Sequence, residues 1–146
     1  WAQALPEDQR PVFSQVDSLA QAVREVKAVW KFALTDDDIP RLQRFAQEVG
    51  ETLGLACEWS WHDQVDLARA GTSKGKRLAQ WVADQGLSMQ NVVAFGDNYN
   101  DLSMLEAAGT GVAMGNAVDE VKARANIVIG DNESTSIAEF IYRQLL

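Results

Sequence analysis

Two carboxylates and two amides follow an apolar run in the segment VVAFGDNYND, residues 92–101. Gly96 lets the backbone turn sharply, so that Asp97 can point its carboxylate into a crevice. Asn100 and Asp101 follow at the start of the next helix. A hard cation such as Mg²⁺ takes one or two carboxylates and completes its shell with substrate phosphate and water. The segment therefore predicts a Mg²⁺ site that also handles a phosphate group.

Helix capping is the alternative interpretation of these residues. Asn98 or Asn100 can serve as an N-cap, and Asp101 is favourable to the helix dipole in the first turn. Capping explains one or two of the residues, but it does not explain a Gly-Asp pair at the end of a buried strand. We therefore favour the metal and phosphate site.

Lys74, in the segment TSKGK, is the second candidate. A lysine at a helix N-terminus is unfavourable for the dipole, and a nearby phosphoryl group would compensate. The alternative is a solvated surface lysine, with Gly75 weakening the start of the helix. The position of Lys74 in the element before the Asp97 strand favours a functional role.

The elements that must position these residues alternate from residue 72 onward. Helices are predicted at 72–86, 100–109, 117–125 and 134–146, and strands at 91–97, 110–115 and 126–130. This alternation is typical of a doubly wound parallel α/β sheet, in which ligands lie at the carboxyl ends of the strands. Asp97 and Asn100 fall just past such an end. We expect Leu78, Trp81 and Val82 to face inward from the first of these helices.

Residues 1–71 predict a mixed α+β layer. Val16, Leu19, Ala20 and Val23 have helical spacing, a strand is expected at 27–34, and the segment 35–54 is a strong helix with Pro40 in its first turn. Its apolar face should comprise Leu42, Phe45, Ala46 and Val49. Two further strands, LACEWSW and QVDLARA, should join at a turn at His62 and Asp63. We expect Cys57, Trp59 and Trp61 to pack in the core, with stacking on a substrate ring as the alternative.

Composition narrows the class of protein. The 146 residues carry a net charge of −8 and are 47% hydrophobic, which argues for a folded protein without a broad nucleic-acid or membrane surface. The single Cys57 cannot form an internal disulfide, which suits the cytoplasm. The chain begins with Trp1, and WAQALPEDQRP reads as the end of an element already under way. We therefore expect that an N-terminal portion precedes it.

The segment GDNYNDLSMLEAAGTGVAMGNAVDEVKARANIVI, preceded by TSKGKRL, resembles the C-terminal part of a Cof-type phosphatase of the haloacid dehalogenase superfamily. The resemblance implies a core domain over residues 72–146, the C-terminal half of a Rossmann-like parallel sheet, and a partial cap domain over residues 1–71. It implies phosphoryl transfer through an aspartyl phosphate, with Lys74 and Asp97 catalytic. Lys74 and Asn100 match phosphate-binding positions, Asp97 the Mg²⁺ ligand, and Asp101 an auxiliary residue behind the metal or lysine.

The nucleophile expected in such a family, a D-x-D-x-T/V motif near the N-terminus, is not found in the sequence. The only D-x-D, Asp36–Asp38, is followed by Pro40 and is interpreted as an acidic helix start. We therefore expect this chain to be inactive alone. We also expect it to expose an apolar sheet edge that invites association, for instance with the missing N-terminal half.

The expected function is Mg²⁺-dependent hydrolysis of a small phosphorylated metabolite. The segment EWSWHDQVDLARAG resembles the enterobacterial family members that act on pyridoxal 5′-phosphate, which is therefore the first substrate expected, followed by sugar phosphates. A phosphomutase of the same superfamily and a non-catalytic metal- and phosphate-binding fragment are the alternatives.

Overall fold

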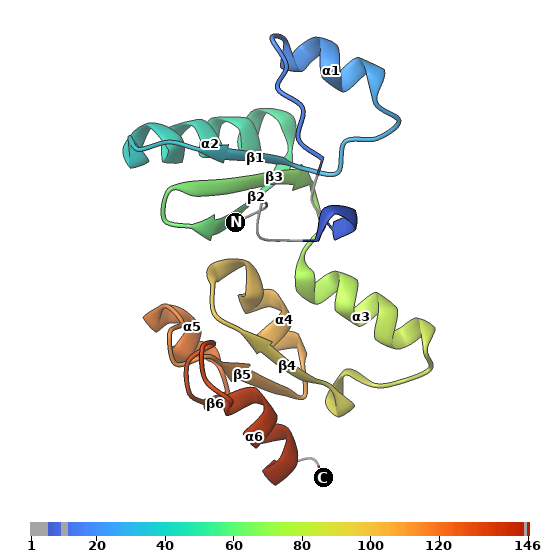
Figure 1. Cartoon of the computed structure of the whole chain (residues 1–146), viewed down its shortest axis with the longest axis vertical. Coiled ribbons are helices and arrows are strands. Elements are labelled where there is room, and N and C mark those ends of the chain that lie inside the picture. The colour runs from blue at the N-terminus through green and yellow to red at the C-terminus, as the bar shows by residue number, and fades with distance from the viewer. Residues whose placement is uncertain (1–5, 10–11, 145) are drawn as a thin grey trace. The chain divides into compact units, whose positions relative to one another are not determined.

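The computed structural model describes residues 6–9, 12–144 and 146 (Figure 1). The chain forms two compact units, one ending at Trp30 and one beginning at Lys31. The first unit holds a 3₁₀ turn, η2 (Glu7–Gln9), and helix α1 (Leu19–Glu25). The predicted helix is confirmed, with Ser18 as its N-cap. Val16, which was expected on its apolar side, lies before the first helical residue. Most of the expected trailing element WAQALPEDQRP lies outside the described residues.

The second unit opens with a three-stranded antiparallel sheet covered by one helix. Its strands are β1 (Phe32–Thr35), β2 (Leu55–Trp61) and β3 (Gln64–Arg69), in the order β1-β3-β2. Val65 and Leu67 point toward helix α2 (Ile39–Leu53), while Asp66 between them points to the other face. The sheet therefore has one apolar face against α2 and one face that α2 leaves open.

Helix α2 follows its sequence signals closely. Asp38 accepts a hydrogen bond from the Arg41 backbone N–H at the N-cap, and Gly54 ends the helix with a φ of 62°. The expected strand at 27–34 begins later, at Phe32. Phe45 was expected on the inward face, but it is 44% exposed, because the buried stripe of α2 runs through Leu42 and Ala46.

A parallel sheet of the order β4-β5-β6 follows, which confirms the predicted α/β class. The boundaries of its elements, given in chain order, are as follows: α3 Lys74–Asp84, η3 Met89–Asn91, β4 Val93–Gly96, η4 Tyr99–Asp101, α4 Leu102–Ala107, β5 Thr110–Ala113, α5 Asp119–Arg124, β6 Ile127–Val128 and α6 Ser136–Gln144. No helix among the described residues has the length and apolar character needed to cross a membrane.

Helices pack on both faces of this parallel sheet. On one face, Ala94 and Ala113 join Leu105 of α4 and Val121 of α5 in a buried apolar cluster. On the other, Phe95 meets Phe140 of α6 edge-to-face, with ring centroids 5.6 Å apart. Neighbouring residues of β4 thus serve opposite layers, as in a doubly wound sheet.

The exposure of Trp81 and the edge of strand β4 both concern expectations from the sequence. Trp81 was expected to face inward, but it is 58% exposed, since α3 packs through Gly75, Leu78 and Val82 and the described residues leave the Trp81 side uncovered. Strand β4 has a strand partner on one side only within the described residues. Whether that edge mediates association stays a prediction, as does the domain boundary at residue 71.

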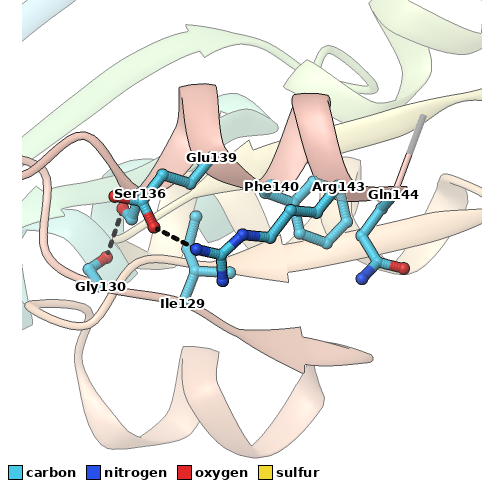
Figure 2. A pocket seen from close by; sticks show the side chains of 7 residues that line it. All are labelled: Ile129, Gly130, Ser136, Glu139, Phe140, Arg143 and Gln144. Atoms are coloured by element: carbon cyan, nitrogen blue, oxygen red, sulfur yellow. Dashed lines mark hydrogen bonds and ion pairs between the residues drawn. The ribbon is translucent and has the colours of Figure 1, made fainter. Parts of the chain in front are cut away.

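Helix α6 closes the sheet at its C-terminal end. A hollow of about 220 Å³ lies between α6 and the segment after β6. Arg143 lies 3.6 Å from Glu139, and Figure 2 shows its side chain reaching back along the helix toward that residue. The Ser136 hydroxyl donates to the Gly130 carbonyl oxygen at 3.1 Å and ties the start of α6 to that segment. These contacts lie within α6 and between α6 and the segment that precedes it, so we assign the hollow no part in the site described below.

Candidate active site

The candidate site is formed where β4 and β5 end. Asp97 follows β4 directly, and Asn116 follows β5, whose carboxyl end lies beside that of β4 because the strands are parallel. The Asn116 side-chain amide donates to Asp97 Oδ2 at 3.2 Å. No hydrogen bond to Asp97 Oδ1 occurs among the described residues, so this oxygen is available to a ligand. The spacing argument did not include Asn116, although its place after the next parallel strand pointed to it.

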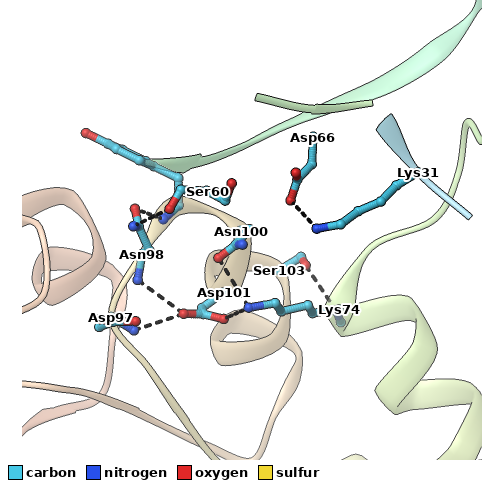
Figure 3. A network of polar contacts seen from close by, with 11 residues as sticks. Lys31, Ser60, Asp66, Lys74, Asp97, Asn98, Asn100, Asp101 and Ser103 are labelled. Carbon is cyan, nitrogen blue, oxygen red and sulfur yellow. Dashed lines mark hydrogen bonds and ion pairs between the residues drawn. The ribbon is translucent and has the colours of Figure 1, made fainter. Parts of the chain in front are cut away.

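Asp101 is the buried acceptor that organises the loop. It is 5% exposed, and its Oδ2 accepts from the backbone N–H groups of Asp97 at 3.0 Å and Asn98 at 3.1 Å. Its Oδ1 accepts from Lys74 Nζ at 2.5 Å (Figure 3). With all these bonds made, the Asp101 carboxylate holds the loop and the lysine together.

Gly96 is required for this arrangement for a reason other than the expected sharp turn. Its φ is not positive, whereas Gly54, Gly71 and Gly86 have positive φ. A Cβ atom on Gly96 would lie 2.5 Å from the Asp101 Cβ, closer than such atoms approach in proteins. The glycine therefore allows Asp101 to fold back against the strand end.

The pKa of Asp101 is lowered from its ordinary value. Burial alone would raise it, but the hydrogen bond from Lys74, the backbone N–H groups of Asp97 and Asn98, and the charge of Lys74 together outweigh burial. Asp101 is therefore ionised at neutral pH and keeps the Lys74 ammonium in place.

Lys74 reaches the loop from the first turn of α3. Its Nζ also donates to Asn100 Oδ1 at 3.2 Å. An ammonium group has three N–H donors, and this side chain is 46% exposed, so one donor remains for a ligand such as a phosphate oxygen. The Asp101 carboxylate offsets the unfavourable position of the Lys74 charge at the helix N-terminus. The sequence interpretation had expected a phosphate group in this role.

Gly75 brings α3 close enough for Lys74 to reach. A Cβ on Gly75 would overlap the carbonyl oxygen of Ser103 in α4, and the Gly75 N–H donates to the Ser103 hydroxyl at 3.1 Å. The glycine that was taken to weaken the helix start is thus the contact point of the two helices.

Both interpretations of the motif hold in part. Asn98 is the N-cap of η4, and a reciprocal capping box links it to Asp101. Capping leaves the Lys74–Asn100 contact and the open oxygen of Asp97 unexplained. Lys74, Asp97, Asn100 and Asp101 lie together around one loop, as their positions in the sequence predicted; their roles in binding stay predictions.

A Mg²⁺ ion fits this donor set only in part. Among the described residues, no group of three or more His, Cys, Asp or Glu side chains could hold a metal ion. Asp101 has its oxygens engaged, whereas Asp97 offers one open oxygen. Because Mg²⁺ is commonly held by one or two carboxylates, phosphate and water, Asp97 can supply one ligand of such a site.

The D-x-D pair lies away from this loop. Asp36 accepts two hydrogen bonds from the Arg41 guanidinium, each at 2.7 Å, and Asp38 caps α2. The pKa of Asp36 is lowered by its hydrogen bonds to Arg41 and to the Asp38 backbone N–H. The interpretation of these residues as a helix start is confirmed.

The antiparallel sheet contacts the loop through Asn98. Its side-chain amide donates to the Ser60 carbonyl oxygen at 2.8 Å, and Ser60 lies at the point where the β2–β3 pairing shifts register. Beside this contact is a hollow of about 410 Å³ lined by Ile39, Gln43, Trp59, Trp61, His62 and Tyr99. Cys57 and Trp59 pack toward α2 as expected, while Trp61 is 55% exposed.

A sequence model of a known protein family matches nearly the whole chain and shows which family it belongs to. The model of haloacid dehalogenase-like hydrolases matches residues 2–141. The chain belongs to the haloacid dehalogenase-like hydrolases. The resemblance seen in the motif sequence is thereby confirmed.

Individual members of this family are similar over much of the chain. Pyridoxal phosphate phosphatase YbhA of Escherichia coli (strain K12) is 70% identical over 146 residues, which are 100% of this chain and 54% of that protein. The Bacillus subtilis (strain 168) protein 5-amino-6-(5-phospho-D-ribitylamino)uracil phosphatase YitU is 34% identical over 73% of this chain and 40% of its own length. The chain thus spans about half the length of the curated relatives it matches.

A solved haloacid dehalogenase-like hydrolase from B. subtilis superposes with a TM-score of 0.82 at 27% identity, over 91% of this chain and 47% of that one. The described sheet order and helix layers therefore belong to the fold of this family.

Proposed function

We propose that the protein carrying this chain is a Mg²⁺-dependent phosphomonoester hydrolase, with pyridoxal 5′-phosphate as its first substrate. The observation that carries the proposal is the Lys74–Asp101–Asn100 cluster beside Asp97, which places a cation and a carboxylate with one open oxygen at the strand ends of a hydrolase fold. The substrate assignment rests on the 70% identity with the E. coli protein, whose name states that substrate.

Each residue has a proposed part in the transfer. Lys74 and Asn100 bind oxygens of the phosphate group, and Lys74 offsets the charge that builds on them during transfer. Asp97 would hold Mg²⁺, which would supply further charge neutralisation when bound. Asp101 fixes Lys74 and the loop, so these groups need no rearrangement when the substrate arrives.

We propose that the attacking carboxylate comes from the half of the relatives' length that this chain does not span. The only D-x-D pair of the chain is engaged in the helix start, which supports this assignment. The nucleophile would form an aspartyl phosphate with release of the alcohol, and water would then release phosphate. The 146 residues alone are then inactive, and cytoplasmic location is part of the same proposal.

Phosphate release by the full-length protein tests this function. Pyridoxal 5′-phosphate should release inorganic phosphate with Mg²⁺ and none with EDTA, whereas the isolated 146-residue chain should release none. Sugar phosphates, the second substrate class, are measured alongside. A phosphorylated product from a sugar phosphate would instead indicate a phosphomutase, and phosphate binding without release from any ester would indicate a non-catalytic protein.

A further inference from the structure

The open face of the antiparallel sheet carries a charged cluster that the proposed phosphate chemistry does not use. Asp66 on β3 and Glu58 on β2 are directly opposite each other in the strand register. Val65 and Leu67, the neighbours of Asp66, face α2, so the two carboxylates project from the other face. Two like charges directly opposite each other on a sheet are destabilising unless a cation or a ligand offsets them.

Lys31 forms an ion pair with one of these two carboxylates, that of Asp66. Lys31 Nζ donates to Asp66 Oδ2 at 2.8 Å, and Figure 3 shows this ion pair beside Asn100 and Lys74, with the Asp66 side chain directed toward them. Asp66 is 9% exposed, and its Oδ1 is buried with no hydrogen-bond partner among the described residues. The Ser60 hydroxyl, at the register shift of β2, is also buried without a hydrogen-bond partner among the described residues. The face thus holds more acceptor capacity than its own residues use.

Glu58 is the accessible member of the pair. It is partly buried, and burial raises its pKa; Lys74 opposes this rise, Asp66 adds to it and Lys31 opposes it. Glu58 is paired with Asp66 in the strand register, and Figure 3 shows the Asp66 side chain directed toward Asn100 and Lys74, so Glu58 lies on the sheet face that is turned toward Lys74. A group bound between them would meet the Lys74 cation at one end and the Glu58 carboxylate at the other.

We infer that this face, defined by Lys31, Glu58 and Asp66, selects substrates whose organic part presents a positively charged or N–H donor group to Glu58. Asp66 is a positioning residue that adds negative charge behind Glu58. The phosphate would bind to Lys74 and Asn100, and the donor group would bind across from it. The protonated ring nitrogen of pyridoxal 5′-phosphate is such a donor, and a carboxylate is its common partner in proteins.

The aromatic hollow is the competing surface for the organic part. It is lined by Ile39 and Gln43 of α2, whereas the Lys31–Asp66 pair lies on the face away from α2 and beside Lys74. We therefore place the donor group on the open face.

The inference rests on the proposed function and is tested in the full-length protein with two matched substrates. One is pyridoxal 5′-phosphate, and the other is its analogue with a C–H group in place of the ring nitrogen. Wild type should prefer the natural ring by about tenfold or more in kcat/KM, since a site built for a donor rejects an analogue that lacks it. Glu58→Gln should abolish this preference by lowering kcat/KM for the natural ring alone. Asp66→Asn should reduce the preference to a smaller extent.

Asp36→Asn is the control, because it makes the same chemical change at a carboxylate that follows β1 and pairs with Arg41 of α2, and it should leave both rates unchanged. Equal rates for both substrates in wild type, or an equal loss on both in Glu58→Gln, would overturn the inference while leaving the phosphatase proposal standing. Failure of wild type to hydrolyse either substrate would instead refute the substrate proposal, and this inference would fail with it.

Discussion

Asp101→Asn should destabilise the protein substantially. The substitution keeps the shape but leaves one oxygen where Asp101 now accepts from Lys74, Asp97 and Asn98. The new amide N–H₂ must face either the ammonium or two backbone N–H groups, so donors oppose donors. A charge-assisted hydrogen bond contributes about 1.5–3 kcal/mol, and Lys74 is half exposed to screening solvent, so we expect a loss of about 2–3 kcal/mol.

The loss should depend on pH in a defined direction. The pKa of Asp101 in the folded protein lies below that of the unfolded chain. Its stabilising effect is therefore fully present above the unfolded pKa, about 3.9, and is lost as the pH falls through the folded pKa. The difference between wild type and Asp101→Asn should be constant from pH 8 to about pH 5 and should shrink below about pH 4.

Urea unfolding of both proteins, followed by circular dichroism at several pH values, measures this difference. Asp36→Asn, at the exposed pair with Arg41, is the matched control and should change the unfolding free energy much less. A change no larger than that of the control, or a difference that persists unaltered at pH 3, would show that the Asp101 carboxylate does not stabilise the loop through its charge.

Three further predictions follow from the contacts of the site and the sheets. Gly75→Ala should lower the free energy of unfolding by about 3 kcal/mol or more, because the new Cβ would overlap the Ser103 carbonyl oxygen. In Gly50→Ala, the new Cβ would lie 3.4 Å from Cys57 Sγ, so the free energy of unfolding should stay within about 1 kcal/mol of wild type. Urea unfolding measures both changes. Similar losses for the two would contradict this account. Lys74→Met should lower kcat for phosphate release by about 10²- to 10³-fold while circular dichroism stays unchanged; an unaltered kcat would remove Lys74 from the phosphate site. Cys57 should react several times more slowly with a thiol reagent at pH 8 than free cysteine does, because burial raises its pKa, and equal rates would show that the thiol is accessible.

The boundaries of a helix or strand could be predicted where its hydrophobic periodicity and the residues typical of its two ends agreed. Helix α2 has an acidic N-cap, a proline in its first turn and a C-terminal glycine, and the structure places its ends at those residues. Inward faces were less predictable, since Phe45 and Trp81 both lie at the margin of a buried stripe. Their exposure depends on which neighbours pack alongside, and helical spacing alone does not specify neighbours.

The grouping of Lys74, Asp97, Asn100 and Asp101 around one loop was predictable, but the bonds among them were not. Parallel strands bring their carboxyl ends together, so Asp97 and Asn100 could be placed from the order of the elements. The Asp101–Lys74 ion pair joins residues 27 positions apart, and the role of Gly75 depends on how closely α3 approaches α4. Such contacts arise from packing between elements, which no local pattern encodes.

Asp97 is proposed to hold the metal that supports phosphate transfer. The most direct test is phosphate release from pyridoxal 5′-phosphate by the full-length protein and its Asp97→Ala variant, with Mg²⁺ and with EDTA. Asp97→Ala should remain folded, since its side chain has one hydrogen bond, to Asn116, among the described residues, and it should lose the Mg²⁺-dependent release. Asp119→Ala, at the start of α5, should retain that release. Mg²⁺-dependent release that persists in Asp97→Ala would contradict the account.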